Sequence, residues 1–117
     1  MEENDQIEEK KPIGWVDDAQ INAWKSMHKQ RFIDEIFVND DDGNEHVTYL
    51  RKPNLENLQM LASYAKKDEE INGLKILFNT IRLGGSDNVK EDPEMYLAAM
   101  SAAGKLFKQK ETKVKKR

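Results

Sequence analysis

Two short runs that mix apolar and polar residues lie near the middle of the chain, on either side of a polar break. Residues 31–38 (RFIDEIFV) and 45–51 (EHVTYLR) are rich in β-branched and aromatic side chains, and NDDDGN separates them. The pattern predicts a β-hairpin in which Gly43 supplies the positive φ of the turn. Because neither run has one clean apolar face and an isolated hairpin is marginal in water, we expect a two- or three-stranded sheet covered by helices on one side.

The second strand is expected to pass directly into a helix. Pro53 has no N–H for a sheet ladder and disfavours the α region for the residue before it, so the strand stops at Lys52. Asn54 is a competent N-cap for the helix that follows. The apolar residues after it recur at helical spacing: Leu55, Leu58, Leu61, Ala62 and Ala65. The spacing predicts an amphipathic helix over residues 54–67.

Residues 19–30 and 69–83 also repeat apolar residues at helical spacing. Each segment follows an acidic residue that can cap a helix, at position 17 or 18 before the first and at Asp68 before the second. The first stripe consists of Ile21, Trp24 and Met27 or His28, and the second of Ile71, Leu74, Leu77 or Phe78, and Ile81. Both segments are therefore predicted to be helices.

A helix stop and a helix start follow in close succession. Leu83-Gly84-Gly85 is expected to end the preceding helix, because a glycine can take the left-handed conformation common at helix ends. Residues 86–90 are expected to form a loop. Asp92-Pro93-Glu94 then supplies a cap, a proline at the first helical position and an acidic first turn. A last helix, whose alanine-rich seam can lie close to its neighbours, is predicted over residues 93–107.

These elements define an α+β fold class: one small domain over residues 14–107, in which a β-hairpin is packed by three to four helices. Residues 1–13 hold too little apolar area to offset chain entropy, so we expect a disordered acidic tail. Residues 108–117 are expected to be a basic helix end or tail. The predicted core consists of Trp24, Ile36, Leu58, Leu61, Leu74, Phe78, Ile81 and Leu106.

Composition narrows the classes of function. The 117 residues are 38% hydrophobic and 35% charged, which suits one domain with a modest core. Neither a membrane-spanning run nor a secretory signal is present in the sequence, so we expect a cytoplasmic protein without membrane contact. The absence of cysteine excludes disulfides and thiolate chemistry, and two histidines make a histidine-based metal cluster improbable.

The charge is distributed unevenly along the chain. The net charge of −3 argues against a dedicated nucleic-acid binder. Residues 1–20 hold seven acidic residues against two lysines, whereas residues 105–117 hold seven basic residues against Glu111. The two ends could attract each other, bind separate partners, or act as solvated tails that keep a small domain soluble. Lysines are also favourable at a helix C-terminus because of the helix dipole. The basic end lacks the interleaved aromatic residues that are typical of proteins that bind single-stranded nucleic acid.

Two motifs could carry chemistry, the acidic turn and the glycine pair. Counted from Asp40, the acidic turn fits a calcium loop at Asn44, but Gly43 comes before the sixth position and Arg51 occupies the twelfth, so a hairpin turn is favoured. The glycine pair at 84–85 lacks a preceding strand and a following Lys-Ser/Thr, which favours a helix stop over a phosphate loop. No nucleophile elbow or metal-ligand pair is present. We expect a protein that is not an enzyme and needs no cofactor or metal.

A protein-binding module is the class that remains. Trp15 is expected in the core by default, with a binding role as the alternative. The partner-binding candidates combine apolar residues expected at the surface with lysines of the basic end. They are Trp15, Met60, Tyr64, Ile76, Met95, Met100, Lys105, Lys108 and Lys110.

The order of the elements resembles a known family. An acidic lead precedes a helix that contains Ala23-Trp24-Lys25, a hairpin ends in Tyr49-Leu50-Arg51-Lys52-Pro53, and a helix pair closes on Leu83-Gly84-Gly85 before an alanine-rich last helix with a lysine-rich end. This arrangement, from about Trp15 to Lys116, resembles small tail-assembly chaperone-like proteins of tailed phages and prophages. The YLRKP and LGG segments are its most specific parts, and neither is catalytic.

The resemblance implies a function without catalysis. Such a protein would act in the cytoplasm of the bacterial host, bind the long helical tape-measure protein, keep it soluble and help to recruit tail-tube subunits. No functional residue carries over with the resemblance. The alternative is a small α+β protein-interaction or nucleic-acid-associated regulatory protein, which would place phosphate contacts of the basic end first.

Overall fold

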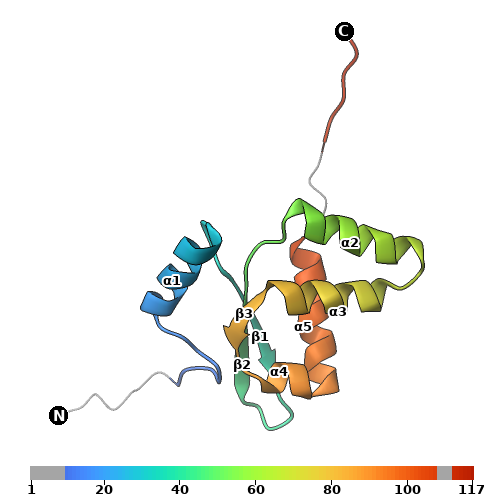
Figure 1. Ribbon diagram of the computed structural model, residues 1–117. Coiled ribbons are helices and arrows are strands. Elements are labelled where there is room, and N and C mark those ends of the chain that lie inside the picture. The colour runs from blue at the N-terminus through green and yellow to red at the C-terminus, as the bar shows by residue number, and fades with distance from the viewer. Residues whose placement is uncertain (1–9, 108–111) are drawn as a thin grey trace, which may run out of the picture.

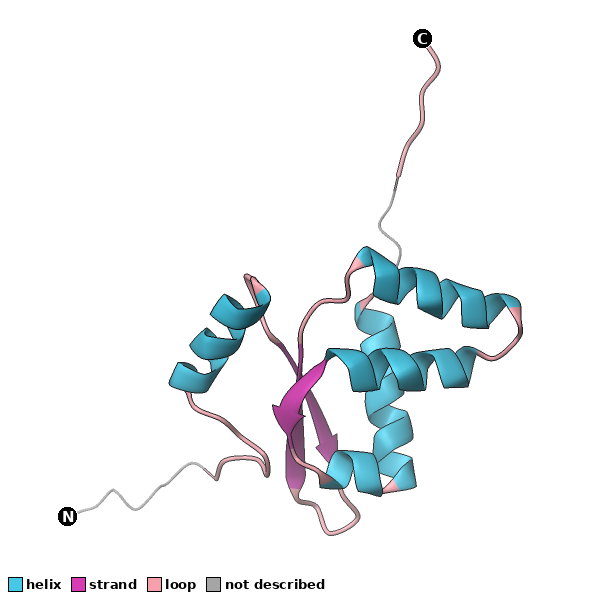
Figure 2. Ribbon diagram, viewed as in Figure 1, coloured by secondary structure: helices cyan, strands magenta, loops and turns pink. Residues whose placement is uncertain are grey.

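A three-stranded antiparallel sheet in the order β1-β2-β3 lies at the centre of the computed structural model, which describes residues 10–107 and 112–117 (Figures 1 and 2). The strands are β1 (Asp34–Asn39), β2 (Glu45–Leu50) and β3 (Arg82–Gly85). The helices are α1 (Asp18–His28), α2 (Leu55–Lys66), α3 (Glu70–Ile81), α4 (Asn88–Glu91) and α5 (Pro93–Leu106). The fold is α+β, as the sequence predicts.

One face of the sheet carries the main core. In the β1–β2 register Ile36 pairs with Thr48 and Asp34 pairs with Leu50, so these residues share a face. Ile36 and Leu50 are buried in one cluster with residues of α3, α4 and α5: Leu77, Phe78, Ile81, Val89, Met95, Ala99, Met100 and Ala103. Within each helix these residues recur at helical spacing, so their side chains share the side that faces the sheet. The helices α3 and α5 therefore cover this face (Figure 2).

The opposite face of the sheet is covered by α1 and the segment before it, which differs from the predicted one-sided cover (Figure 1). The rings of Trp24 and Tyr49 lie 5.4 Å apart between centroids, and the N–H of Val16 donates to the Tyr49 hydroxyl at 3.1 Å. Burial raises the pKa of Tyr49. The helix itself has no fully buried residue, so Trp24 is its main anchor on the sheet.

The glycine-rich segment after α3 is a strand instead of the predicted helix stop. β3 pairs with β2 through Thr48 with Gly85 and Tyr49 with Gly84. A Cβ at Gly85, where φ is 116°, would lie 2.4 Å from the carbonyl oxygen of Val47, and a Cβ at Gly84 would lie 2.9 Å from the Trp24 ring. The glycines therefore permit close strand pairing and close packing of Trp24. The predicted loop at 86–90 contains most of the short helix α4.

Three of the predicted helix caps are confirmed. Asp17 accepts from the N–H of Gln20 at the start of α1. The Asn54 side chain accepts from the N–H of Asn57, whose side chain in turn accepts from the N–H of Asn54, which forms a capping box. Asp92 accepts from the N–H groups of Glu94 and Met95 at the start of α5. Asp68 does not cap α3, because it adopts a left-handed φ of 59° in the connection, and Glu69 takes the N-cap position without a side-chain hydrogen bond.

The predicted core is correct in part. Ile36, Phe78 and Ile81 are buried, and Leu61 and Leu74 pack against the cluster. Leu58 and Leu106 are not part of the core. Leu58 is 38% exposed and Leu106 is 49% exposed, because both lie on the outer sides of their helices. Trp24 is half-buried on the second face of the sheet.

The chain is ordered from a point before the predicted domain start. Ile13 forms a parallel bridge with His46, with hydrogen bonds to Glu45 at 2.8 Å and from Val47 at 3.0 Å. The predicted acidic tail over 1–13 is therefore wrong at its last residue, and residues 1–9 of that tail lie outside the described residues. Across residues 10–107 and 112–117, none of the helices is both long and apolar enough to cross a bilayer.

Candidate functional site

Helix α2 carries two apolar faces, of which only one is packed against the protein. Met60 and Leu61 are half-buried against the core cluster, and Tyr64 contacts the helix α3 at Gly73. A Cβ added at Gly73 would lie 2.9 Å from the Cβ of Tyr64, so the glycine allows α2 and α3 to pack closely. This inner face joins α2 to the domain.

The outer face of α2 is apolar and exposed. Leu55 is 71% exposed and Leu58 is 38% exposed, and Ala62 and Ala65 on the same side are also exposed. We call these four residues the open seam. They are separated by three, four and three positions, which is the spacing of the a and d residues of a heptad repeat. The open seam therefore has the pattern of a helix surface that packs against another helix.

The structure does not gather the predicted partner-binding residues into one surface. Met95 and Met100 are 5% and 6% exposed in the main core, so their prediction as surface residues is wrong. The cause is that the inner side of α5, which includes Ala99 and Ala103, packs toward the sheet and α3 and takes both methionines with it. Met60 and Tyr64 are half-buried on the inner face of α2.

The other predicted residues lie apart. Ile76 is 37% exposed on α3, and Trp15 is 41% exposed on the opposite side of the sheet, with the Lys11 ammonium 3.7 Å from its ring centroid. Lys105 is exposed near the end of α5. Lys108 and Lys110 lie outside the described residues. The open seam is thus an exposed apolar surface with a regular pattern, and it includes Leu58, which the sequence places in the predicted core.

The signal for the open seam is present in the sequence. Leu55, Leu58, Ala62 and Ala65 appear in the predicted helical stripe, but the same stripe includes Leu61. A helix of 12 residues with two apolar faces gives one broad stripe, and spacing alone does not tell which side meets the domain. The inner face is decided by the contact with Gly73, which is distant in sequence.

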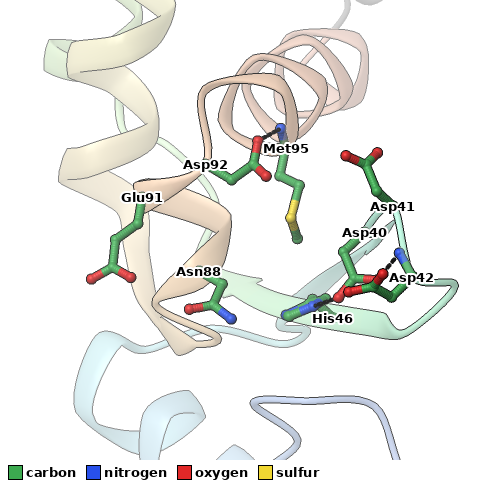
Figure 3. A pocket seen from close by; sticks show the side chains of 8 residues that line it. All are labelled: Asp40, Asp41, Asp42, His46, Asn88, Glu91, Asp92 and Met95. Atoms are coloured by element: carbon green, nitrogen blue, oxygen red, sulfur yellow. Dashed lines mark hydrogen bonds and ion pairs between the residues drawn. The ribbon is translucent and has the colours of Figure 1, made fainter.

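An acidic pocket of about 370 Å³ lies between the β1–β2 turn and the α4–α5 junction (Figure 3). It is lined by Asp40, Asp41, Asp42, His46, Asn88, Glu91, Asp92 and Met95. His46 is 1% exposed, with Nε2 2.9 Å from an Asp40 oxygen and Nδ1 2.8 Å from the Ser86 hydroxyl. Since the Asp40 carboxylate only accepts, Nε2–H donates to it, and in the neutral ring Nδ1 accepts from Ser86.

This Ser-His-Asp chain joins the hairpin to the end of β3 and does not expose a nucleophile. The Ser86 residue is 4% exposed, its N–H donates to Val47, and its carbonyl accepts from Arg82, so the backbone around the hydroxyl is fully engaged. The Ser86 hydroxyl and the His46 ring therefore lie inside the fold, where they join β3 to the hairpin. Among the described residues, no group of three or more His, Asp or Glu side chains is arranged to hold a metal ion.

Asp40 organises the turn itself. Its Oδ1 accepts from the N–H groups of Asp42 and Asn44, both at 2.9 Å, and Gly43 has the predicted positive φ, 81°. The hydrogen bond from His46, followed by those from the turn backbone, lowers the pKa of Asp40 to about 2. The predicted hairpin turn is confirmed, and the first aspartate of the acidic run serves the fold.

Comparisons with protein-family models, with curated proteins and with solved structures find no match to this chain.

Proposed function

We propose that this protein binds, without catalysis, a long amphipathic helix of another protein through the open seam of α2. The observation that supports the proposal is the exposed heptad spacing of Leu55, Leu58, Ala62 and Ala65 on a helix whose opposite face is packed into the domain. Such a helix presents its apolar side outward. A second helix can pack on it with side chains of one inserted between those of the other.

The small residues of the open seam favour a close helix contact. Leu55 and Leu58 can each bury a large side chain, and burial of one leucine contributes about 1.5–3 kcal/mol relative to exposure. Ala62 and Ala65 let the two backbones approach along the C-terminal half of α2. Because α2 spans three turns, each molecule covers a short stretch of a partner helix, and several molecules are needed to cover a long one.

The resemblance to tail-assembly chaperone-like proteins names a partner of this chemistry. A tape-measure protein is long and helical, and its apolar stripe would aggregate if left uncovered. We therefore propose that the protein covers such a stripe in the bacterial cytoplasm, keeps the partner soluble, and releases it as tail-tube subunits are recruited.

The test is co-expression with the long helical protein encoded beside this gene. The double variant Leu55→Lys, Leu58→Lys should leave the protein folded, because both side chains are exposed, and should lose the soluble complex. The matched control is Leu97→Lys, which changes a leucine that is 49% exposed on α5, away from the open seam. The control variant is expected to keep the complex.

Two results would overturn the proposal. One is a complex that survives the double variant at wild-type yield. The other is binding that falls steeply with ionic strength and is carried by DNA or RNA, since the nucleic-acid alternative requires release of counterions while an apolar helix contact loses little with salt. Neighbouring genes that encode no helical protein would remove the tape-measure assignment and leave the seam to be tested with a heptad-repeat peptide.

A further inference from the structure

The outer edge of β1 has backbone groups that are directed away from the sheet. On β2, the N–H of Val47 donates to Ile13 at 3.0 Å and its carbonyl accepts from Ser86 at 2.9 Å, so this residue faces the β3 side. Alternation along an antiparallel strand then turns the even-numbered residues of β2 toward β1. The β1–β2 register leaves three residues of β1 with outward N–H and C=O groups, here called the free edge: Glu35, Phe37 and Asn39.

The free edge has little of the protection that natural sheets give to their edges. Within residues 10–107 and 112–117, no hydrogen bond from another segment reaches the main chain of these three residues, and all three are exposed. The strand contains no proline and no bulge, and the Phe37 side chain at its middle is 50% exposed. An edge with these properties is a template for one more strand.

The geometry excludes a second β1 as that strand. Helix α5 contacts β1 of its own chain (Figure 1). Neighbouring strands lie about 4.8 Å apart, whereas packed helices need about 8–10 Å between their axes. Pairing of β1 with β1 of another copy would therefore force the two α5 helices into the same space. The free edge accepts an extended segment that carries no covering helix of its own.

Residues 112–117 (TKVKKR) meet this requirement. They have no secondary structure, all six are exposed, and Val114 is 92% exposed. Thr112 and Val114 are β-branched and lie on the same side of an extended chain, with basic residues around them. Because all six residues are exposed, the segment is available to pair with another copy.

The acidic turn beside β1 and the basic residues of 112–117 indicate which segment binds the free edge and in which direction it runs. β1 leads into the acidic turn, and Asp40 and Asp41 line a small pocket together with Asp92 and Glu94 of the α5 start. We propose that residues 112–117 of a second copy add to the free edge, parallel to β1, with Val114 beside Phe37. This direction carries Lys115, Lys116 and Arg117 toward the acidic turn. The contact joins different surfaces of two copies, so it links molecules head to tail.

The absence of native cysteine makes the contact measurable by cross-linking. A copy with Phe37→Cys is mixed with a differently tagged copy with Val114→Cys and oxidised. Residues on neighbouring strands lie within disulfide reach, so the mixed pair should form the linked dimer. The matched control replaces Phe37→Cys by Ser101→Cys, an exposed position on α5, and should yield no dimer above random collision.

Direction and charge are tested in the same assay. A parallel segment places position 116 beside 39, so Lys116→Cys should link to Asn39→Cys and not to Glu35→Cys. The triple variant Lys115→Glu, Lys116→Glu, Arg117→Glu in the Val114→Cys copy should lose the link, and 1 M salt should weaken it.

Three outcomes would overturn the inference. They are equal yields with Phe37→Cys and Ser101→Cys, a link that survives the triple charge reversal, and a disulfide that forms only within one chain when both Phe37→Cys and Val114→Cys are present. Neither the free edge nor the tail includes the open seam of α2. If the cross-linking test fails, the proposed helix-binding function is unaffected. If the co-expression test fails, the proposed contact between the free edge and residues 112–117 is unaffected.

Discussion

Comparison of Gly85→Ala with Gly43→Ala separates two reasons for which a position needs glycine. One is a positive φ, and the other is a lack of space for a Cβ atom. Gly85 and Gly43 both have positive φ, 116° and 81°, so an alanine at either site strains the backbone. At Gly43 an added Cβ meets nothing within 4 Å, whereas at Gly85 it lies 2.4 Å from Val47 O and 2.6 Å from the Thr48 Cα. Gly43→Ala therefore measures backbone strain, and Gly85→Ala measures strain plus collision with β2.

The magnitudes follow from these contacts. Strain at a left-handed position costs about 1–2 kcal/mol, which is the whole expected effect of Gly43→Ala. At Gly85 the colliding atoms are backbone, so β3 must move away from β2, which adds about 1–3 kcal/mol for overpacking. The neighbouring Ser86 to Val47 hydrogen bond, 2.9 Å long, weakens as well and adds about 0.5–1.5 kcal/mol. Gly85→Ala should thus cost about 2.5–6.5 kcal/mol.

Urea unfolding followed by the fluorescence of the two tryptophans reports the free energy of unfolding for both variants. Gly43→Ala is expected to unfold at a modestly lower urea concentration, and Gly85→Ala to unfold far earlier or to lack the folded baseline. Equal losses for the two variants would refute the pairing of β3 with β2 as described and restore the segment 83–85 as a simple helix end.

Other predictions test α2 and the acidic turn. Leu61→Ala should cost about 2–4 kcal/mol and Leu58→Ala under about 1 kcal/mol in urea unfolding, because only Leu61 packs against the core; equal costs would contradict the assignment of inner and outer faces. The lowered pKa of Asp40, about 2 against 3.8, adds stability above pH 4 that is lost as pH falls from 4 to 2. Asp40→Asn should flatten this part of the unfolding midpoint against pH, and an unchanged slope would rule out the His46 contact.

Local signals predict much of the fold. Pro53 and Asn54 mark the passage from strand to helix, and the Asp92 cap marks the start of α5, because each acts on backbone groups within three residues. β3 was not predictable in the same way. Its glycines resemble a helix end in sequence, and only Val47 and Trp24, far away along the chain, decide that the segment is a strand.

The candidate site likewise combines features that the local sequence predicts with features that depend on distant contacts. The spacing of Leu55 and Leu58 is visible in the sequence, but their exposure depends on which side of α2 meets Gly73. The hydrogen bond between His46 and Ser86 joins residues 40 positions apart, so no local pattern announces it. Periodicity gives the faces of a helix, and the tertiary contacts choose between them.

The most direct test of helix binding by the open seam is the reactivity of a single thiol at its centre. The Leu58→Cys variant is labelled with a thiol reagent alone and in complex with the long helical partner, and Leu97→Cys on α5 serves as the reference. The account predicts that both thiols react quickly in the free protein and that complex formation strongly protects only the thiol at position 58. Equal labelling of the two positions in a purified complex would contradict binding through the open seam.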